Sequence, residues 1–236
     1  MPRQFNPDEP ELMDRPQPVS AELERDLANL ASLNRWFGSH RLLRHFLRRW
    51  WKKGDAPRVL DLCTGAGDLP AVMCEYARAH GVTPRITALD ANPATLAIAR
   101  QRCEKFPEIE FVQGNALTYG AREAGAAAPP PYDLVHCSLA LHHFSEGDAI
   151  SLLRHCRTLG SRVLISDLER AWSTTLGVWL LTALFYREPM TKHDGRESAR
   201  RAFSFAEFRA MAQAAGWPDI HHTRFAFCRQ AIWLED

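Results

Sequence analysis

Five short apolar segments alternate with longer amphipathic segments after residue 57, and this alternation constrains the fold more than any other feature. Each apolar segment has the length and the residue types of a buried β-strand. Alternating strands and helices predict a parallel sheet with helices on both faces, which is the α/β fold class. The predicted strands are 58–62, 86–90, 110–113, 134–137 and 162–166.

The residues between these strands include types that begin helices. Asn92 and Pro93 have the pattern of an N-cap followed by the first helical residue. Ser145 and Asp148 resemble a capping box, with Asp in place of the usual Glu. Segment 121–131 is rich in Ala, Gly and Pro, so it is predicted to be a surface loop.

Two further segments precede the first strand. Residues 1–19 hold five of the 15 prolines and are predicted to form an extended arm. Residues 20–55 predict two amphipathic helices, with Ser20 and Ser39 as their N-caps, that form a helical cap. Residues 35–58 hold eight bases and one acid. This basic segment indicates either a surface for an anionic ligand or membrane, or, as we favour, the solvated face of an amphipathic helix.

The alternation stops after the fifth strand. Segment 168–203 is a long insertion with an apolar helical stretch, which predicts a helix that is buried or that covers an apolar ligand. A capping box from Ser204 to Glu207 begins the next helix. Segment 220–234 predicts two strands joined near Arg224, in a hairpin at the far end of the sheet.

Composition excludes several classes of protein. The 236 residues suit one domain, and 46% apolar with 24% charged residues is typical of a globular chain. A formal charge of +1 provides no global field for nucleic-acid binding. The six cysteines are scattered without a CxxC pair, which favours free thiols in a reducing compartment. With no apolar leader at the N-terminus, the sequence predicts a cytoplasmic protein.

Acidic and glycine residues gather where the first two strands end. Asp61 ends the first strand and is followed by a turn containing Gly65 and Gly67, which allow a close approach of the backbone to a ligand. Asp90 ends the second strand, where an acid can bind both hydroxyls of a ribose. Ligands of open α/β sheets bind at these carboxyl ends, so we expect a nucleotide-type pocket.

Two kinds of nucleotide compete for this pocket. A dinucleotide needs G-x-G-x-x-G, but Pro70 replaces the third glycine, and Asp68 would repel a pyrophosphate. An acid in the turn suits a ligand with a cationic end. S-adenosylmethionine (SAM) carries an ammonium and a sulfonium and has no phosphate.

The segment VLDLCTGAGDLP at 59–70 resembles motif I of class I SAM-dependent methyltransferases, and its spelling is closest to the ubiquinone/menaquinone-biosynthesis type. Segments 114–116, 132–138 and 163–167 resemble the later motifs of that family in the same order. The resemblance implies a SAM-binding domain at 56–236. Its expected fold is a Rossmann-like, doubly wound, seven-stranded sheet with the last strand antiparallel, to which this chain adds the helical cap and the insertion.

The resemblance also implies how the cofactor is held, with S-adenosylhomocysteine (SAH) as its product. Asp90 would bind the ribose, Ala91 and Asn92 would flank the adenine, and the Asn115 carbonyl would face the adenine amine. Gly65, Gly67 and Ser138 would line the methionine end. The predicted cofactor-binding residues are Asp61, Cys63, Thr64, Gly65, Gly67, Asp68, Asp90, Ala91, Asn92, Asn115, Ala116 and Ser138.

Methyl transfer to oxygen requires alignment of the acceptor and removal of its proton, which a histidine can perform near neutral pH. His142 and His143 follow the fourth strand, beside the methyl-donor end, and His193 lies in the insertion that would build the acceptor pocket. These three are the predicted catalytic residues. No carboxylate cluster accompanies them in the sequence, so no metal is predicted.

The acceptor is expected to be small and hydrophobic because the insertion is apolar. Its predicted contacts are Arg35, Trp36, Phe37, Trp179 and Tyr186. The leading hypothesis is O-methylation of a phenolic or polyketide-like secondary metabolite. C-methylation of a quinone precursor, N-methylation of a phospholipid head group and a non-catalytic SAM-binding scaffold are the alternatives. We expect no nucleic-acid partner and no integral membrane segment, while peripheral membrane contact, a monomer and a homodimer all stay open.

Overall fold

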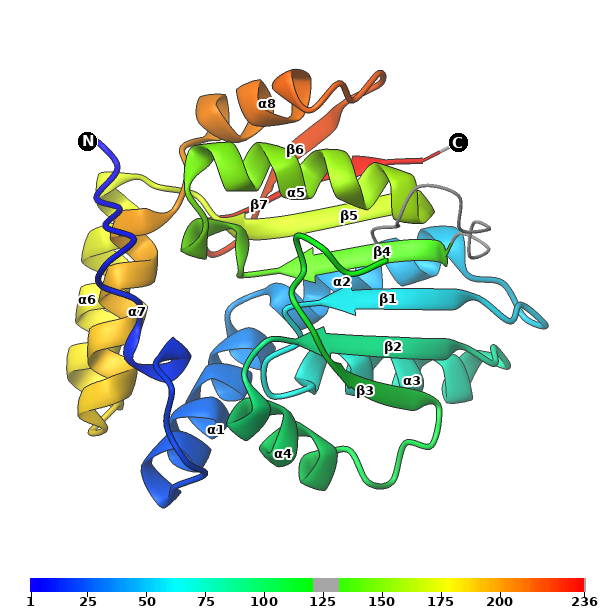
Figure 1. Ribbon diagram of the computed structural model, residues 1–236, viewed down its shortest axis with the longest axis horizontal. Coiled ribbons are helices and arrows are strands. Elements are labelled where there is room, and N and C mark those ends of the chain that lie inside the picture. Colours follow the sequence, from blue (N-terminus) through cyan, green and yellow to red (C-terminus); the bar gives the residue numbers. More distant parts are fainter. Residues whose placement is uncertain (121–131, 236) are drawn as a thin grey trace.

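A computed structural model describes residues 1–120 and 132–235, so the loop predicted at 121–131 lies outside the described residues. The described chain forms one seven-stranded sheet in the order β3-β2-β1-β4-β5-β7-β6 (Figure 1). Its strands are β1 (Arg58–Leu62), β2 (Arg85–Asp90), β3 (Ile109–Gln113), β4 (Tyr132–Ser138), β5 (Gly160–Leu168), β6 (His221–Phe225) and β7 (Arg229–Leu234).

The pairing of the strands confirms the predicted topology. Strands β1 to β5 are parallel, whereas β7 lies antiparallel between β5 and β6. The hairpin turn lies near Arg224 as predicted, since β6 ends at Phe225, which is in register with Arg229 of β7. Phe227 and Cys228 make this turn with positive φ angles of 61° and 56°.

Two helix pairs cover the two faces of the sheet, as Figure 1 shows. Helices α2 (Ser39–Trp50) and α3 (Asp68–His80) bury their apolar residues against one face. Helices α5 (Glu146–Leu159) and α8 (Phe205–Ala214) cover the other. The prediction that α2 belongs to a separate cap is therefore corrected, since its apolar stripe completes the core of the sheet.

Helix α2 also begins differently from the prediction. Gly38 with φ 99°, and not Ser39, is the N-cap residue. A Cβ at Gly38 would lie 3.2 Å from the Ala226 carbonyl oxygen, so the close approach of the hairpin favours glycine there. The basic side chains of α2 lie on its outer face, where Arg44 pairs with Glu75 and Arg49 with Glu235.

The remaining helices gather at the carboxyl ends of the parallel strands. They are η1 (Leu12–Asp14) in the arm, α1 (Ala21–Trp36), η2 (Leu141–His143), α6 (Trp172–Phe185) and α7 (Pro189–Arg201); the exception is α4 (Pro93–Arg102), which begins there and packs along β2 and β3. Thr191 of α7 donates to Asp26 of α1 at 2.6 Å and accepts from Asn29 at 3.0 Å, and these bonds join α7 to α1. The arm crosses between α7 and α1, so it wraps its own domain (Figure 1).

Helix α6 only partly matches the prediction that its apolar side chains are buried or cover a ligand, because Val178 and Leu181 line a cavity while several others are exposed. Trp172, Leu184 and Phe185 are each more than 70% exposed, whereas Thr174 and Thr182 are its buried residues. The helix packs on α7 through the polar side, and its outer face is apolar. Within the described residues, no helix combines the length and the apolar character that crossing a bilayer requires.

Candidate active site

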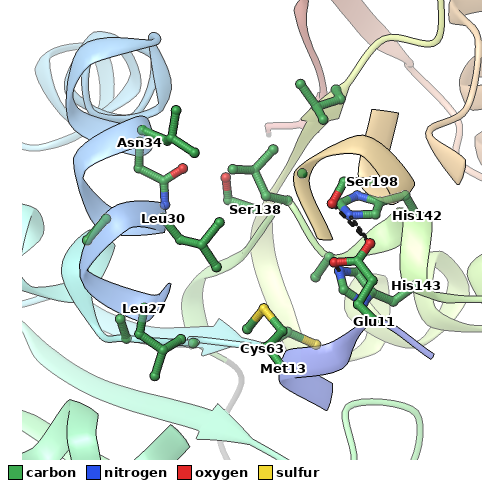
Figure 2. A pocket seen from close by; sticks show the side chains of 18 of the residues that line it. Glu11, Met13, Leu27, Leu30, Asn34, Cys63, Ser138, His142, His143 and Ser198 are labelled. Carbon is green, nitrogen blue, oxygen red and sulfur yellow. Dashed lines mark hydrogen bonds and ion pairs between the residues drawn. The ribbon is translucent and has the colours of Figure 1, made fainter. Parts of the chain in front are cut away.

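A cavity of about 940 Å³ opens at the carboxyl ends of β1, β2, β4 and β5. Helix α1 forms one wall and α6 another, and the arm crosses the opening between them. Figure 2 shows Leu27 and Leu30 of α1 on one side of it and Glu11, His142 and His143 on the other. The cavity thus has an apolar wall and an opposing polar cluster, with the strand ends between them.

The glycine-rich turn after β1 has two glycines with different roles. Gly65 lines the cavity with φ 56°, and a Cβ there would meet nothing within 4 Å. Gly67 does not line the cavity, and a Cβ there would lie 3.0 Å from the Cys103 sulfur and 3.3 Å from the Phe111 ring. Gly65 therefore leaves room beside the cavity, whereas Gly67 is required by packing against the core.

Asp90 shapes the next part of the cavity wall. One carboxylate oxygen accepts from the Gly65 backbone N–H at 2.9 Å, and the other accepts from the Asn92 N–H at 3.0 Å. Burial raises the pKa of Asp90, although these bonds oppose the shift. The Asn92 side chain caps α4 as predicted, and its amide also donates to the Met13 carbonyl of the arm.

Three other predicted residues of this wall have partners or features that the sequence did not reveal. Asp61 pairs with His136 of the neighbouring strand at 2.5 Å, and both side chains are buried. Asp68 lines the cavity but already contacts His40 at 3.0 Å. The hydroxyl of Thr64 is buried at the cavity and has no hydrogen-bond partner among the described residues.

Of the remaining residues predicted to bind the cofactor, some line the cavity and others do not. Cys63, Ala91 and Ser138 line the cavity. Asn115 and Ala116 do not line it: the Asn115 side-chain carbonyl accepts from the Leu117 N–H at 2.9 Å, and Ala116 is part of the core between the sheet and α5. The structure thus brings most of the predicted set together around one cavity, with Gly67, Asn115 and Ala116 outside its lining.

His142 lines the cavity in a fixed orientation. Its ring Nδ1 contacts Asp167 at 2.7 Å, and its backbone N–H donates to the other oxygen of the same carboxylate at 3.0 Å. In the neutral form of the ring, a proton on Nδ1 donates to Asp167 and leaves a lone pair on Nε2. That Nε2 is buried and has no hydrogen-bond partner among the described residues. An imidazole held this way can accept a proton from a molecule in the cavity.

His143 is held as a cation between two carboxylates of the arm. Its Nδ1 contacts Asp14 at 2.6 Å, and its Nε2 lies 3.8 Å from Glu11. Burial alone would lower the pKa of His143, but attraction to Glu11 and Asp14 outweighs burial and raises the pKa to about 10. Burial alone would raise the pKa of Asp14, but attraction to His143 outweighs burial, so the pKa of Asp14 is lowered. His143 is therefore a poorer candidate base than His142 in this state.

Glu11 and Asp14 are functional candidates that the sequence did not identify. Glu11 is only 2% exposed, lies 3.7 Å from His142 Nε2 and accepts from the Ser198 hydroxyl at 3.0 Å. Burial raises its pKa. An acid in a proline-rich arm has no local pattern that indicates a site. The paired histidines were the available signal, because a buried imidazole pair attracts a carboxylate from elsewhere in the chain.

His193 occupies a different place from the two other histidines. It lies on α7 with its side chain 46% exposed, contacts Asp194 at 2.9 Å and does not line the cavity. Asp194, in contrast, accepts from the backbone N–H groups of Leu12 and Met13 at 2.8 and 2.9 Å. This placement does not support His193 as the base, and it assigns the neighbouring carboxylate the role of anchoring the arm.

The five predicted acceptor contacts are mostly outside the cavity. Phe37 lines it, while Arg35 and Trp36 line a smaller surface cavity beside α2 and α3. Trp179 and Tyr186 line neither cavity, and the guanidinium of Arg196 on α7 lies over the Trp179 ring. The α6 residues that do line the large cavity include Val178, Leu180 and Leu181.

Comparisons with known proteins find relatives for the segment from β1 to the start of β5. Residues 59–160 match a family model described as a methyltransferase domain. A 2-phytyl-1,4-naphtoquinone methyltransferase from Thermosynechococcus vestitus is 41% identical over 81 residues, which is 34% of this chain and 35% of that protein. The protein of the same name from Synechococcus elongatus is 25% identical over 208 residues, covering 80% of this chain and 83% of the relative.

A solved structure extends the likeness to nearly the whole fold. The plantazolicin methyltransferase BpumL in complex with SAH superposes with a TM-score of 0.64 at 12% identity. The superposition covers 92% of this chain and 91% of that one. At this identity the likeness establishes the shared Rossmann-like architecture and not the acceptor.

Proposed function

We propose that this chain, a class I SAM-dependent methyltransferase close to the quinone-biosynthesis type, transfers methyl to a hydroxylated aromatic acceptor. The observation that carries the proposal is the unpartnered Nε2 of His142, held by Asp167 at the wall of a partly apolar cavity. O-methylation of a phenol is the reaction that this arrangement supports best. This proposal is supported by the position of His142, a candidate base, beside the apolar part of the cavity.

The residues at the strand ends fit the cofactor. The open space beside Gly65 admits a ligand close to the backbone, and the unpartnered Thr64 hydroxyl needs a polar partner there. Asp61 and Asp90 place two carboxylates at the cavity, which suits a ligand with a cationic end. Asp90 would hold the ribose and the turn would hold the methionine end. When bound, SAM supplies an electrophilic methyl group on sulfur.

The chain's own residues would prepare the acceptor. His142 Nε2 accepts the hydroxyl proton of the acceptor, and Asp167 stabilises the imidazolium that forms. The deprotonated oxygen of the acceptor would then be the nucleophile for the methyl group that SAM would supply. A positioned base contributes about 10²–10⁴-fold to such a step, and alignment of the two reactants contributes more.

The apolar wall selects the rest of the acceptor. Leu27 and Leu30 of α1 face the cavity from one side, and Val178 and Leu181 of α6 line it from another. These side chains can contact an aromatic or alkyl surface but cannot pair with a charged group. We therefore propose a small hydrophobic acceptor, as the sequence indicated. The six free thiols of the chain support a cytoplasmic location for the reaction.

C-methylation of a quinone precursor is a second candidate, favoured by relatives named as naphthoquinone and demethylmenaquinone methyltransferases. Removal of a ring hydroxyl proton raises the electron density at the neighbouring ring carbon. The same His142 could therefore serve transfer to carbon, provided that the acceptor presents that carbon to the methyl group. The two reactions differ in which acceptor atom faces the cofactor.

The test is an assay with methyl-labelled SAM, a panel of phenols and a reduced naphthoquinone. We expect label in a product whose new methyl resonance, by NMR, is that of an O-methyl group; a C-methyl resonance would establish the second candidate. His142→Asn should lose at least about 100-fold in rate, whereas the matched change His193→Asn should lose little. Stabilisation of the protein by SAH without any methylated product from the panel would contradict the proposed acceptor class but leave the cofactor intact.

A further inference from the structure

Two histidines and one glutamate converge at the polar end of the cavity. Nε2 of His142 lies 3.7 Å from one Glu11 oxygen, and Nε2 of His143 lies 3.8 Å from the other. One ligand atom from each of the three residues lies within 4.8 Å of the others. Figure 2 shows the two rings and the carboxylate facing one another beside the cavity. We propose that these three side chains bind a divalent transition metal ion of the zinc class.

The separations suit an ion better than direct hydrogen bonds. Distances of 3.7 and 3.8 Å exceed a hydrogen bond between nitrogen and oxygen, which is usually near 2.9 Å. Two ligands at about 2.0–2.1 Å from a tetrahedral ion lie about 3.4 Å apart. The three side chains therefore need to approach one another only modestly to share an ion. Two imidazoles and a carboxylate form a donor set that zinc-class ions accept.

The unpartnered nitrogen is an independent indication of a ligand. Nε2 of His142 belongs to a side chain that is 2% exposed, and it has no hydrogen-bond partner among the described residues. A buried polar atom left unpaired costs free energy, commonly about 1–3 kcal/mol, so such an atom indicates an unseen partner. The nitrogen is aimed at Glu11, where an ion would be placed.

The surroundings of the cluster are those of a metal site. Asp167 holds His142 at Nδ1 at 2.7 Å, and Asp14 holds His143 at Nδ1 at 2.6 Å. Both rings therefore have a carboxylate on one nitrogen and present the other to the same point. Histidines that ligate metals are usually oriented in this way. The Ser198 hydroxyl donates to Glu11 at 3.0 Å and fixes the third ligand similarly.

All three proposed ligands come together only when the arm is in place. His142 and His143 come from η2 on the sheet, whereas Glu11 comes from the arm, which Asp194 anchors through Leu12 and Met13. An ion would thus bind the arm to the wall of the cavity. An ion bound there would occupy the Nε2 lone pair that the proposed function assigns to proton removal, so ion binding and base catalysis by His142 would exclude each other. That last point rests on the proposed function, whereas ion binding does not.

The experiment is a titration of the full chain, first stripped with a chelator, with Zn²⁺ by calorimetry and with Co²⁺ by visible absorption. We expect one ion per chain and cobalt d–d bands typical of four- or five-coordinate nitrogen and oxygen ligation. Glu11→Gln and His143→Asn should bind at least about 100-fold more weakly. Asp14→Asn and Asp167→Asn, which retain all three ligands, should weaken binding by about 10- to 100-fold. His193→Asn is the matched control, and it should bind as the wild type does.

Three results would overturn the proposal. They are no stoichiometric binding by the wild type, unchanged affinity in Glu11→Gln and His143→Asn, or loss of binding in the His193→Asn control. A cooperative thermal unfolding transition in each variant would exclude misfolding. Glu11→Gln and His143→Asn both change residues at or near the arm, outside the core of the sheet. Methyl transfer by the metal-free protein would leave the proposed function standing. Tight binding of one ion, together with no methylation of the acceptor panel by the metal-free protein, would leave the site standing and contradict the proposed acceptor.

Discussion

Asp167 contacts His142 through both of its carboxylate oxygens, one on the ring Nδ1 at 2.7 Å and one on the backbone N–H at 3.0 Å. The two contacts fix the position of the residue as well as the orientation of its ring. Burial alone would raise the pKa of Asp167, but attraction to the protonated His142 ring and hydrogen bonds from that ring and from backbone N–H groups outweigh burial and lower the pKa. The carboxylate therefore stays charged. Asp167 is thus a positioning residue that acts through His142.

Asp167→Asn tests this relationship. An amide in place of the carboxylate can reverse the tautomer of His142 and remove the stabilisation of the imidazolium. We expect the kcat of methyl transfer to fall by about 10²–10⁴-fold, with a smaller change in the KM for the acceptor. Steady-state kinetics measure both constants. Asp148→Asn, at the exposed start of α5, is the control and should retain activity. An unchanged kcat in Asp167→Asn would show that Asp167 does not position His142 for the reaction.

The two faces of α6 provide a matched pair of substitutions. Leu181 lines the cavity, while Leu176 lies on the same helix, is 48% exposed and does not line it. Leu181→Asp should raise the KM for a hydrophobic acceptor by roughly 10- to 100-fold, because a polar group then faces the acceptor's apolar surface. Leu176→Asp should leave the KM unchanged. Equal effects of the two changes would mean that α6 does not contact the acceptor.

Asp194 anchors the arm through two charge-assisted hydrogen bonds, so its removal should release η1 from α7. In Asp194→Ala we expect faster hydrogen exchange at the Leu12 and Met13 amides and a higher KM for the acceptor, since the arm forms part of the cavity wall. Exchange measured by mass spectrometry on N-terminal peptides tests the first expectation. Asp8→Ala, an exposed carboxylate of the same arm, should change neither; unaltered exchange in Asp194→Ala would show that other contacts hold the arm.

Asp26 makes the stability of the protein depend on pH. Burial raises the pKa of its carboxyl from 3.8 to about 6 in the folded state, despite the hydrogen bond from Thr191. The folded protein therefore binds this proton more tightly than the unfolded chain. The contribution of Asp26 to stability falls as pH rises from about 4 to 6 and stays low above that range.

Asp26→Asn removes the buried charge and retains an oxygen for Thr191. We expect it to raise the free energy of unfolding at pH 8 by up to about 3 kcal/mol relative to its effect at pH 4. Denaturant unfolding at the two pH values measures this difference. Glu22→Gln, at an exposed position of the same helix, should show no such dependence. A gain of equal size at pH 4 and pH 8 would contradict the assigned pKa.

The regular part of the fold was predictable because its signals are local. Apolar runs of strand length, helix caps such as Asn92 and Ser204, and the turn after Asp61 each lie within a few residues of the structure that they specify. Even there, contacts with distant segments changed details. The N-cap of α2 is Gly38 and not the predicted Ser39, because the β6–β7 hairpin approaches closely there. Helix α2 packs on a face of the sheet, which its apolar stripe covers.

The polar cluster shows where the sequence stops being informative. His143 and Asp14 are 129 positions apart, and the acidic arm has no periodicity that indicates where it lies. The all-apolar surface of α6 was equally ambiguous, since a helix that is apolar all round gives no direction to its buried side. The side of α6 that packs on α7 carries the buried Thr182, whose hydroxyl accepts a hydrogen bond from Arg196 of α7.

The sequence by itself therefore determined the alternating strands, the parallel sheet with its terminal hairpin, and the acidic and glycine residues at the strand ends. These follow from short-range preferences and from the periodicity of apolar side chains. Only the tertiary structure decided that the arm closes over the cavity, that Glu11 meets His142 and His143, and that α6 leaves its apolar face exposed. Those arrangements depend on contacts between distant segments, whose free energy arises from burial and pairing that no local pattern encodes.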